Sequence, residues 1–92
     1  MEISIEEYKS RLTEVFLLDV RDEHEYEIYN IGGHLIPLPE LSNRIHEIPR
    51  WQEIVTVCKM GARGKKAAAF LTQRGFHVSN LQGGLHAWAK GK

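Results

Sequence analysis

Two short apolar runs limit most strongly what this chain can fold into: residues 15–20 (VFLLDV) and residues 54–58 (IVTVC). Both runs are rich in β-branched or large apolar side chains, and neither alternates between apolar and polar residues. Such runs are typical of strands that are buried on both faces, as in a parallel sheet. They therefore predict a sheet whose two sides are covered by other parts of the chain.

The segments between and around these runs predict helices and further short strands. Ser4 and Asp22 can each cap the start of a helix, and Gly75 stands where a helix commonly ends. Strands and helices then alternate along the chain, which favours an α/β domain with a mainly parallel sheet and a site at the carboxyl ends of its strands. We expect helices over residues 5–12, 23–29, 39–48, 65–74 and 85–90, and further strands over residues 34–36 and 76–81.

The length of 92 residues leaves room for one hydrophobic core, so we expect a single domain over residues 1–92. No run of about 18 apolar residues is present, as a membrane-spanning helix would require. The N-terminal residues lack the basic patch and apolar stretch of a secretory signal. A single Cys excludes an internal disulfide. Together these features predict a cytoplasmic protein that does not associate with a membrane.

The charged residues are unevenly distributed along the chain. Residues 1–53 hold all 12 Asp and Glu but only 5 Lys and Arg, a net charge of −7, whereas residues 54–92 hold 7 Lys and Arg and no Asp or Glu, a net charge of +7. Such a split can mark an anion-binding side, or the two parts can interleave in one fold and cancel. Nucleic-acid binding is the weaker interpretation, because no aromatic residues alternate with the basic ones to stack on bases.

Cys58 stands at the end of the second apolar run, where parallel sheets build their sites. The thiolate is the reactive form of cysteine, and the following helix start and the glycines Gly61 and Gly64 can direct backbone amides toward it. The same cradle would hold a persulfide or an oxyanion. The alternative is that Cys58 is a small core residue. Four nearby cations can also stabilise an anion: Lys59, Arg63, Lys65 and Lys66.

At this point six features, in order along nearly the whole chain, resemble the rhodanese-like family. The loop spacing separates this family from the related cysteine phosphatases, whose larger loop wraps a phosphate, because only four residues lie between Cys58 and Arg63. The six features are Leu17-Leu18-Asp19-Val20-Arg21; Glu25-Tyr26; Gly33-His34; Cys58 to Arg63; Ala67-Ala68 and Leu71 with Gly75-Phe76; and Gly83-Gly84-Leu85-His86-Ala87-Trp88.

The resemblance implies a three-layer α/β fold with a five-stranded, mainly parallel sheet flanked by helices. It implies that Cys58 is the catalytic residue and carries sulfur as a persulfide, held by the backbone amides of residues 59–63. Lys59 would line the mouth of the site, and Arg63 would bind an anion or order the loop. The residues that the resemblance implies for substrate binding are Lys59, Met60, Gly61, Ala62 and Arg63.

Four further residues resemble positions with structural roles near the family's site. Asp19 and Arg21 would order the region around it, and Arg21 and Glu25 are spaced to pair across one helical turn. His34 would have a hydrogen-bonding role in a turn. Gly64 stands where the family often has Ser or Thr, so we expect it to be a weaker cap for the helix that follows.

Two classes of function remain open. The first is an enzyme, a sulfurtransferase that moves sulfur from thiosulfate or from a protein or small-molecule persulfide to cyanide, a thiol or a sulfur-carrier pathway. The second is a non-catalytic interaction module with the same fold, in a sulfur-trafficking or signalling assembly. We favour the enzyme because the Cys and the glycine loop are both present. We expect a monomer that binds no nucleic acid and no cofactor, and no metal because the histidines lack ligand spacing with Cys58.

Overall fold

The computed structural model describes residues 1–91, so the last residue of the predicted domain, Lys92, lies outside the described residues. The two apolar runs form strands, as predicted. In chain order the elements are β1 (Glu2–Ile3), α1 (Ile5–Ser10), β2 (Val15–Asp19), α2 (Glu23–Ile28), β3 (His34–Leu35), the 3-10 helices η1 (Leu38–Asn43) and η2 (Ile45–Glu47), β4 (Glu53–Val57), α3 (Ala62–Gln73), β5 (Val78–Leu81) and α4 (Gly84–Lys90).

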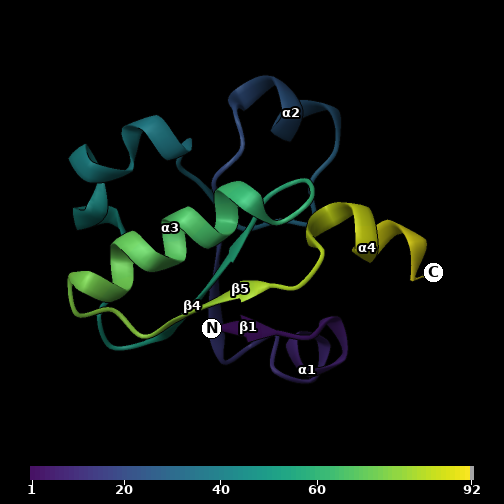
Figure 1. The fold of residues 1–92 in the computed structure, drawn as a ribbon, viewed down its shortest axis with the longest axis horizontal. Coiled ribbons are helices and arrows are strands. Elements are labelled where there is room, and N and C mark those ends of the chain that lie inside the picture. Colours follow the sequence, from purple (N-terminus) through teal and green to yellow (C-terminus); the bar gives the residue numbers. More distant parts are fainter. Residues whose placement is uncertain (92) are drawn as a thin grey trace.

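The five strands form one parallel sheet in the order β1-β5-β4-β2-β3. β4 lies at the centre, between β2 and β5, and its carboxyl end leads into the loop before α3 (Figure 1). This sheet confirms the expected α/β class and the expected five strands. The residues themselves did not predict β1, a two-residue strand at the edge of the sheet, because such a short segment carries no periodic pattern.

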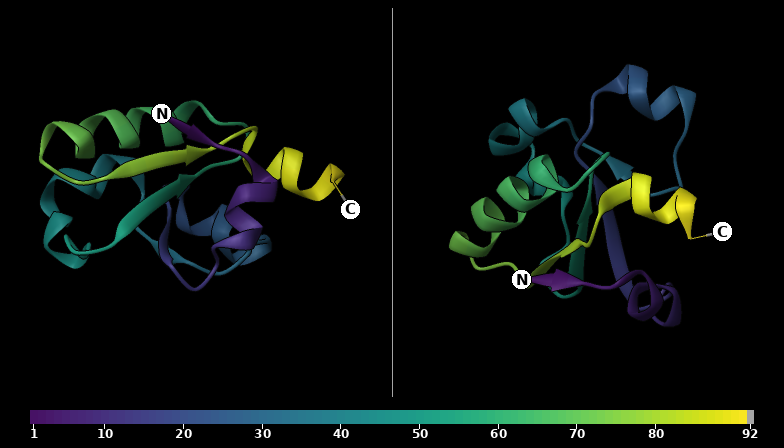
Figure 2. Two further views of the ribbon diagram at one scale, coloured as in Figure 1. Left: turned by 90° about the horizontal axis from the view of Figure 1, so that it is seen from below. Right: turned by 45° about the vertical axis from the view of Figure 1, so that its right-hand side comes forward.

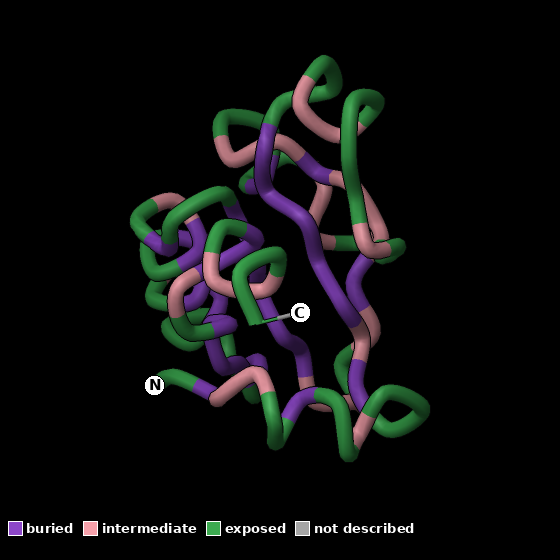
Figure 3. The backbone as a smooth tube through the Cα atoms, turned by 90° about the vertical axis from the view of Figure 1, so that its right-hand side faces the viewer, coloured by how far each residue is buried: buried purple, intermediate pink, exposed green. Residues whose placement is uncertain are grey.

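Side chains on the two faces of the sheet pack into two separate cores. Leu18 and Ile54 point into the core beneath α3 and the 3-10 helices, whereas Leu17 and Val55 point into the core beneath α1 and α4. This alternation follows from the two-residue period of a strand. Figure 2 shows the helices on both sides of the sheet. The longest runs of buried residues are 17–21, 54–58 and 78–81, which lie on β2, β4 and β5 or directly after them, and Figure 3 shows the buried backbone in purple.

The three predicted caps form, two at the starts of helices and one after the end of a helix. Ser4 accepts a hydrogen bond from the Glu7 amide at 3.0 Å at the start of α1. Asp22 and Glu25 form a reciprocal capping box at the start of α2. Gly75 follows α3 with a φ of +90°, a conformation that glycine adopts without strain. Only residues 20–22 separate the carboxyl end of β2 from α2, which lies on the side of the molecule where the loop after β4 lies (Figure 1).

The prediction of one helix over residues 39–48 is wrong. The segment forms η1 and η2 instead, and the chain changes direction at Arg44, whose φ of −129° is not helical. The Arg44 guanidinium binds the carboxylates of Glu40 and Glu47 at 2.8 and 2.7 Å, which stabilises the break.

Among the described residues, every helix is too short or too polar to reach across a lipid bilayer.

Candidate active site

Cys58 is the first residue after β4, at the carboxyl edge of the parallel sheet. The backbone amides of Gly61 and Gly64 donate hydrogen bonds to its Sγ atom at 3.1 and 3.2 Å. Only 1% of the surface of Cys58 is exposed, and the residue packs into the core beneath α3. The sulfur atom is therefore held by main-chain donors and covered by its neighbours in this conformation.

The sulfur atom takes the place of a side-chain cap at the start of α3. The N-cap residue, Gly61, has no side chain with which to accept a hydrogen bond. Gly64 is the third residue of the helix, where the amide has no acceptor within the helix, and it donates to Cys58 Sγ instead. The positive end of a 12-residue helix thus faces the sulfur, which stabilises a negative charge there.

The amides that bind the sulfur are not the set that the resemblance implies, which is the amides of residues 59–63. Of these residues only Gly61 donates to the sulfur, and the second donor is Gly64. The reason is that α3 begins at Ala62 instead of Lys65, because Gly61 turns the chain directly into the helix with a φ of +122°. The expectation that Gly64 caps the helix is therefore wrong, since Gly64 lies within its first turn.

A buried pair of polar side chains, Thr56 on β4 and Asn80 on β5, lies beneath this loop. The two residues are partners in the register of the sheet. The Thr56 hydroxyl lies 2.9 Å from the Gly64 carbonyl oxygen and 3.1 Å from Asn80 Oδ1. Asn80 Nδ2 donates to the Gly61 carbonyl oxygen at 3.4 Å. The pair therefore binds the carbonyl groups of Gly61 and Gly64, the two residues whose amides bind the sulfur.

Asn80 also explains why residue 64 has no side chain. A Cβ atom added to Gly64 would lie 2.0 Å from Asn80 Oδ1, a severe overlap. Sequence reasoning assigned no role to Thr56 or Asn80. Their one signal is that each is a polar residue within a strand of otherwise mainly apolar residues, and only the register of β4 with β5 brings the two side chains together.

Arg63 ties the loop to α2 through a bidentate ion pair. Its two terminal nitrogens bind the two carboxylate oxygens of Glu25 at 2.6 and 2.9 Å. The hydrogen bonds from Arg63 are the main reason that the pKa of Glu25 falls to about 2. Because the guanidinium is already occupied, the geometry favours the loop-ordering role of Arg63 over the anion-binding one.

Arg21 and Asp19 form a buried ion pair at the end of β2. The Arg21 Nη2 atom lies 2.7 Å from Asp19 Oδ2, and both side chains are almost fully buried. Arg21 does not bind the Glu25 carboxylate, so the expected pair across one helical turn is wrong. The guanidinium instead donates to the backbone carbonyl oxygens of Glu25 and Tyr29, at 3.3 and 2.7 Å, because the Glu25 carboxylate is held by Arg63. Arg21 thereby fastens the end of α2 to the sheet.

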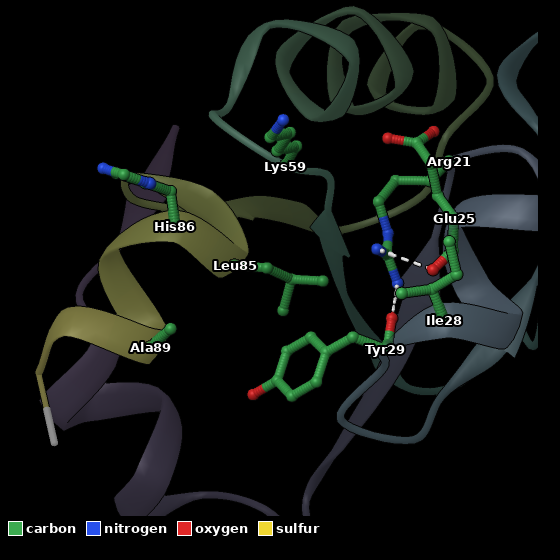
Figure 4. Close-up of a pocket in the computed structure, with 8 residues that line it drawn as sticks. All are labelled: Arg21, Glu25, Ile28, Tyr29, Lys59, Leu85, His86 and Ala89. Carbon is green, nitrogen blue, oxygen red and sulfur yellow. Dashed lines mark hydrogen bonds between the residues drawn. The ribbon is translucent and has the colours of Figure 1, made fainter.

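The side chains at the start of the loop are exposed. Lys59 lines a pocket between α2 and α4 (Figure 4), and within residues 1–91 it forms no ion pair. Met60 is 59% exposed, and Ala62 is also exposed. These three predicted substrate-binding residues are therefore exposed to solvent at the start of the loop and of α3.

His34 lies on β3, and its contacts are with another part of the molecule. Its Nε2 atom lies 2.7 Å from Glu47 Oε1, and its ring packs 5.7 Å from the Phe16 ring, between centroids. The structure thus places His34 with η2 and does not bring it to the Cys58 loop.

The acidic and basic parts of the chain interleave around the loop. Glu25 neutralises Arg63, and Lys65 lies 3.6 Å from Glu2. Of the four cations that the sequence places after Cys58, two therefore have carboxylate partners. Within residues 1–91, no three His, Cys, Asp or Glu side chains gather where they could ligate a metal ion.

The fold and this site define a class of protein: a small parallel α/β domain whose loop directs backbone amides at a cysteine after the central strand. The chain belongs to the rhodanese-like domain family, whose sequence profile matches residues 4–91. It is 36% identical, over 99 aligned positions, to a protein from Allochromatium vinosum named sulfurtransferase, and the match covers 97% of this chain and 88% of that one.

Solved structures support the same assignment. The rhodanese-related protein from Thermoplasma volcanium superimposes with a TM-score of 0.92 over 98% of this chain and 91% of that one, at 24% identity, which shows the shared fold. A NAD-dependent persulfide reductase from A. fulgidus is 40% identical, with a TM-score of 0.78. That match covers 95% of this chain but only 15% of the longer protein.

Proposed function

We propose that this chain is a sulfurtransferase that carries sulfur as a persulfide on Cys58. The observation that carries this proposal is the pair of amides, from Gly61 and Gly64, that point at Sγ from the start of α3. A persulfide anion needs the same stabilisation as a thiolate, and main-chain donors at a helix start supply it without a general base. The similarity to a protein named sulfurtransferase supports the same reaction class.

In the first half of the reaction, the Cys58 thiolate attacks the outer sulfur of the donor. With thiosulfate, a new bond forms between Sγ and that sulfur, and the bond between the two thiosulfate sulfurs breaks. The electron pair of the broken bond leaves with sulfite, and the enzyme keeps a persulfide anion. A protein or small-molecule persulfide would donate in the same way, with a thiolate as the leaving group.

In the second half, a nucleophile attacks the terminal sulfur of the persulfide and regenerates the Cys58 thiolate. Cyanide would leave as thiocyanate, and a thiolate would leave as a new persulfide, so that charge and electrons balance in both cases. The exposed Lys59 attracts anionic donors to the mouth of the loop, while the ion pair of Arg63 with Glu25 holds the loop in place. A thiol used in this way must stay reduced, which fits a cytoplasmic location.

One observation favours the alternative, a non-catalytic interaction module. Cys58 is only 1% exposed, so a donor can reach the sulfur only when neighbouring side chains move. The side chains of Met60 and Lys59 are exposed, and within residues 1–91 neither side chain forms a hydrogen bond or an ion pair that a movement would break. The enzyme remains the better proposal, because a module has no need for two amides directed at the sulfur.

Intact-mass spectrometry tests the proposal directly. Wild-type protein treated with thiosulfate should gain the mass of one sulfur atom, and cyanide should remove it. Cys58→Ser, which keeps the shape of the site, is the control and should gain nothing. If wild-type protein gains no sulfur from thiosulfate or from a small-molecule persulfide, the sulfur-carrier proposal is wrong and the interaction module replaces it.

A further inference from the structure

A hydrogen-bonded network extends from the Cys58 loop to the edge strand β1, and the side chain of Asn80 is its centre. Only 1% of the surface of Asn80 is exposed. Its Nδ2 atom donates to the Gly61 carbonyl oxygen at 3.4 Å and to the Glu2 carboxylate on β1 at 3.2 Å. Its Oδ1 atom lies 3.1 Å from the Thr56 hydroxyl. No step of the proposed reaction uses this network.

The partners of Asn80 fix the direction in which its amide group points. Two acceptors, the Gly61 carbonyl oxygen and the Glu2 carboxylate, face Nδ2, and a reversed amide would place its oxygen against both of them. Glu2 is itself held by α3, because Lys65 Nζ lies 3.6 Å from the same carboxylate oxygen. A buried amide destabilises the fold unless it is hydrogen-bonded, and across residues 1–91 every buried side-chain nitrogen and oxygen atom has a partner. The network is therefore complete in one arrangement.

The network fastens the first turn of α3 to the sheet. The Gly61 carbonyl oxygen accepts the Lys65 amide at 2.9 Å, which begins the helix, and it also accepts Asn80 Nδ2. The Gly64 carbonyl oxygen lies 2.9 Å from the Thr56 hydroxyl. Both ends of the turn are thus hydrogen-bonded to side chains of β4 and β5, and the catalytic cysteine directly follows β4. Because hydrogen bonds are directional, they fix the orientation of the turn more closely than apolar packing would.

The same turn carries the two amides that donate to Cys58 Sγ at 3.1 and 3.2 Å. Donors that are already aligned stabilise a charged reacting group without first having to move. We propose that Asn80 is a positioning residue for sulfur transfer, which keeps the amides of Gly61 and Gly64 directed at the sulfur. Glu2 orients the Asn80 amide. The inference rests on the proposed function and adds residues that act on the reaction without touching the sulfur donor.

The experiment measures persulfide formation in a single turnover, by intact mass, at increasing thiosulfate concentrations. Asn80→Ala should lower the maximum rate about ten- to a hundredfold, the effect of a misplaced catalytic group. The thiosulfate concentration that gives half of the maximum rate should stay as in wild type, because Asn80 is buried away from the donor. Glu2→Ala removes only the outer partner of the amide and should lower the maximum rate less than Asn80→Ala does.

Two substitutions at Thr56 separate the loss of a hydrogen bond from a change in packing. Thr56→Val keeps the shape of the side chain without the hydroxyl and should lower the maximum rate, whereas Thr56→Ser keeps the hydroxyl and should retain it. Ser79→Ala is the matched control. Ser79 is also a buried polar residue of β5, but its hydroxyl lies 3.5 Å from Glu53 and makes no recorded contact with the Cys58 loop. Its substitution should leave the maximum rate unchanged.

Amide NMR gives a readout that a loss of stability alone does not move. In wild-type protein the amide protons of Gly61 and Gly64 should change their chemical shifts when the persulfide forms, because both donate to the sulfur. In Asn80→Ala and Thr56→Val these changes should be smaller. Circular dichroism confirms that each variant is folded under the assay conditions. Glu2→Ala, near the surface, decides the question if a buried substitution prevents folding.

The outcomes separate the two proposals. If wild-type protein forms no persulfide, the proposed function fails. If persulfide forms but the folded variants at Asn80, Thr56 and Glu2 keep the wild-type maximum rate, only the positioning role is wrong. A lower rate with unchanged shifts of the Gly61 and Gly64 amides would also overturn it, because the network would then act by another route.

Discussion

At the scale of single residues, the contact between Gly64 and Asn80 gives a prediction whose sign is unusual. Replacing a Gly within a helix by Ala, at a position where the added methyl group meets no other atom, usually raises the free energy of unfolding by about 0.5–1 kcal/mol. At Gly64 the added Cβ atom would lie 2.0 Å from Asn80 Oδ1. We therefore expect Gly64→Ala to lower the free energy of unfolding, measured in urea, by about 1–3 kcal/mol, as overpacking of a core does.

A double mutant distinguishes destabilisation by this overlap from destabilisation that any substitution at position 64 would cause. Asn80→Ala removes the atom that the new Cβ meets, so Gly64→Ala should cost little or nothing in an Asn80→Ala background. The coupling between the two positions should then be of order 1 kcal/mol or more. Additive effects of the two substitutions would contradict the account of Gly64.

The residues of the site divide into those that the sequence could predict and those that it could not. Cys58, Gly61 and Gly64 were identifiable because a thiol after an apolar run and glycines in the loop that follows it have a local signature, but the sequence assigned the helix cap to Gly64 when it is Gly61. Asn80 and Thr56 were not, because their role depends on the register between β4 and β5, which a sequence does not reveal. For the same reason the partner of Glu25 was assigned to the nearby Arg21, whereas it is Arg63, 38 positions away.

At the scale of elements, the ion pair between Arg63 and Glu25 joins α2 to the start of α3. Arg63 lowers the pKa of Glu25 from 4.5 to about 2. A depressed carboxyl pKa stabilises the fold above the unfolded-state pKa, and this stabilisation is lost as the pH falls toward the folded-state pKa. The contribution should therefore be complete at neutral pH and disappear between about pH 4.5 and pH 2. Because both side chains are partly exposed, we expect it to be only about 1 kcal/mol.

Comparison of Glu25→Gln with wild type at neutral and acidic pH measures this contribution. The glutamine keeps one oxygen that can accept the Asp22 amide in the capping box, while it removes the charge and one of the two oxygens that Arg63 binds. The difference in unfolding free energy should be present near pH 7 and close to zero near pH 2. Glu27→Gln, at an exposed position on the same helix, is the matched control. A difference that stays constant with pH would contradict the assignment of the pKa shift to Arg63.

Elements defined by local signals were predicted, and those defined by tertiary contacts were not. The central strands β2 and β4 and the caps of α1 and α2 follow from side-chain pattern and capping chemistry. The segment 39–48 has apolar residues at helical spacing, yet it forms two 3-10 helices, because Arg44 is held out of helical conformation by carboxylates on both sides. Apolar spacing reports which side chains face the core, and it does not distinguish an α-helix from consecutive shorter turns.

At the scale of the whole molecule, the two faces of one sheet contribute side chains to both hydrophobic cores. Neighbouring residues of each central strand, such as Ile54 and Val55, belong to opposite cores, so neither core can form without the other. The first and last parts of the described chain also meet beneath the sheet. The rings of Tyr8 and Trp88 pack edge to face with 5.9 Å between their centroids, and the Lys9 ammonium lies 5.1 Å from the Trp88 ring.

This arrangement predicts that a substitution that destabilises one core also lowers the stability measured by a fluorescent side chain that packs against the other core. Leu71 is fully buried in the core beneath α3, whereas Trp88 packs against the core beneath α4. In a Trp51→Phe background, which removes the other, 87% exposed Trp, emission comes from Trp88 alone. Leu71→Ala should lower the stability reported by Trp88 emission in urea by about 2–5 kcal/mol, with the same midpoint as the loss of helical circular dichroism. Exposed Thr72→Ala should change it by less than about 0.5 kcal/mol. A transition of the helical signal that precedes the Trp88 transition would mean that α3 and its core unfold independently, against the cooperativity that a shared sheet requires.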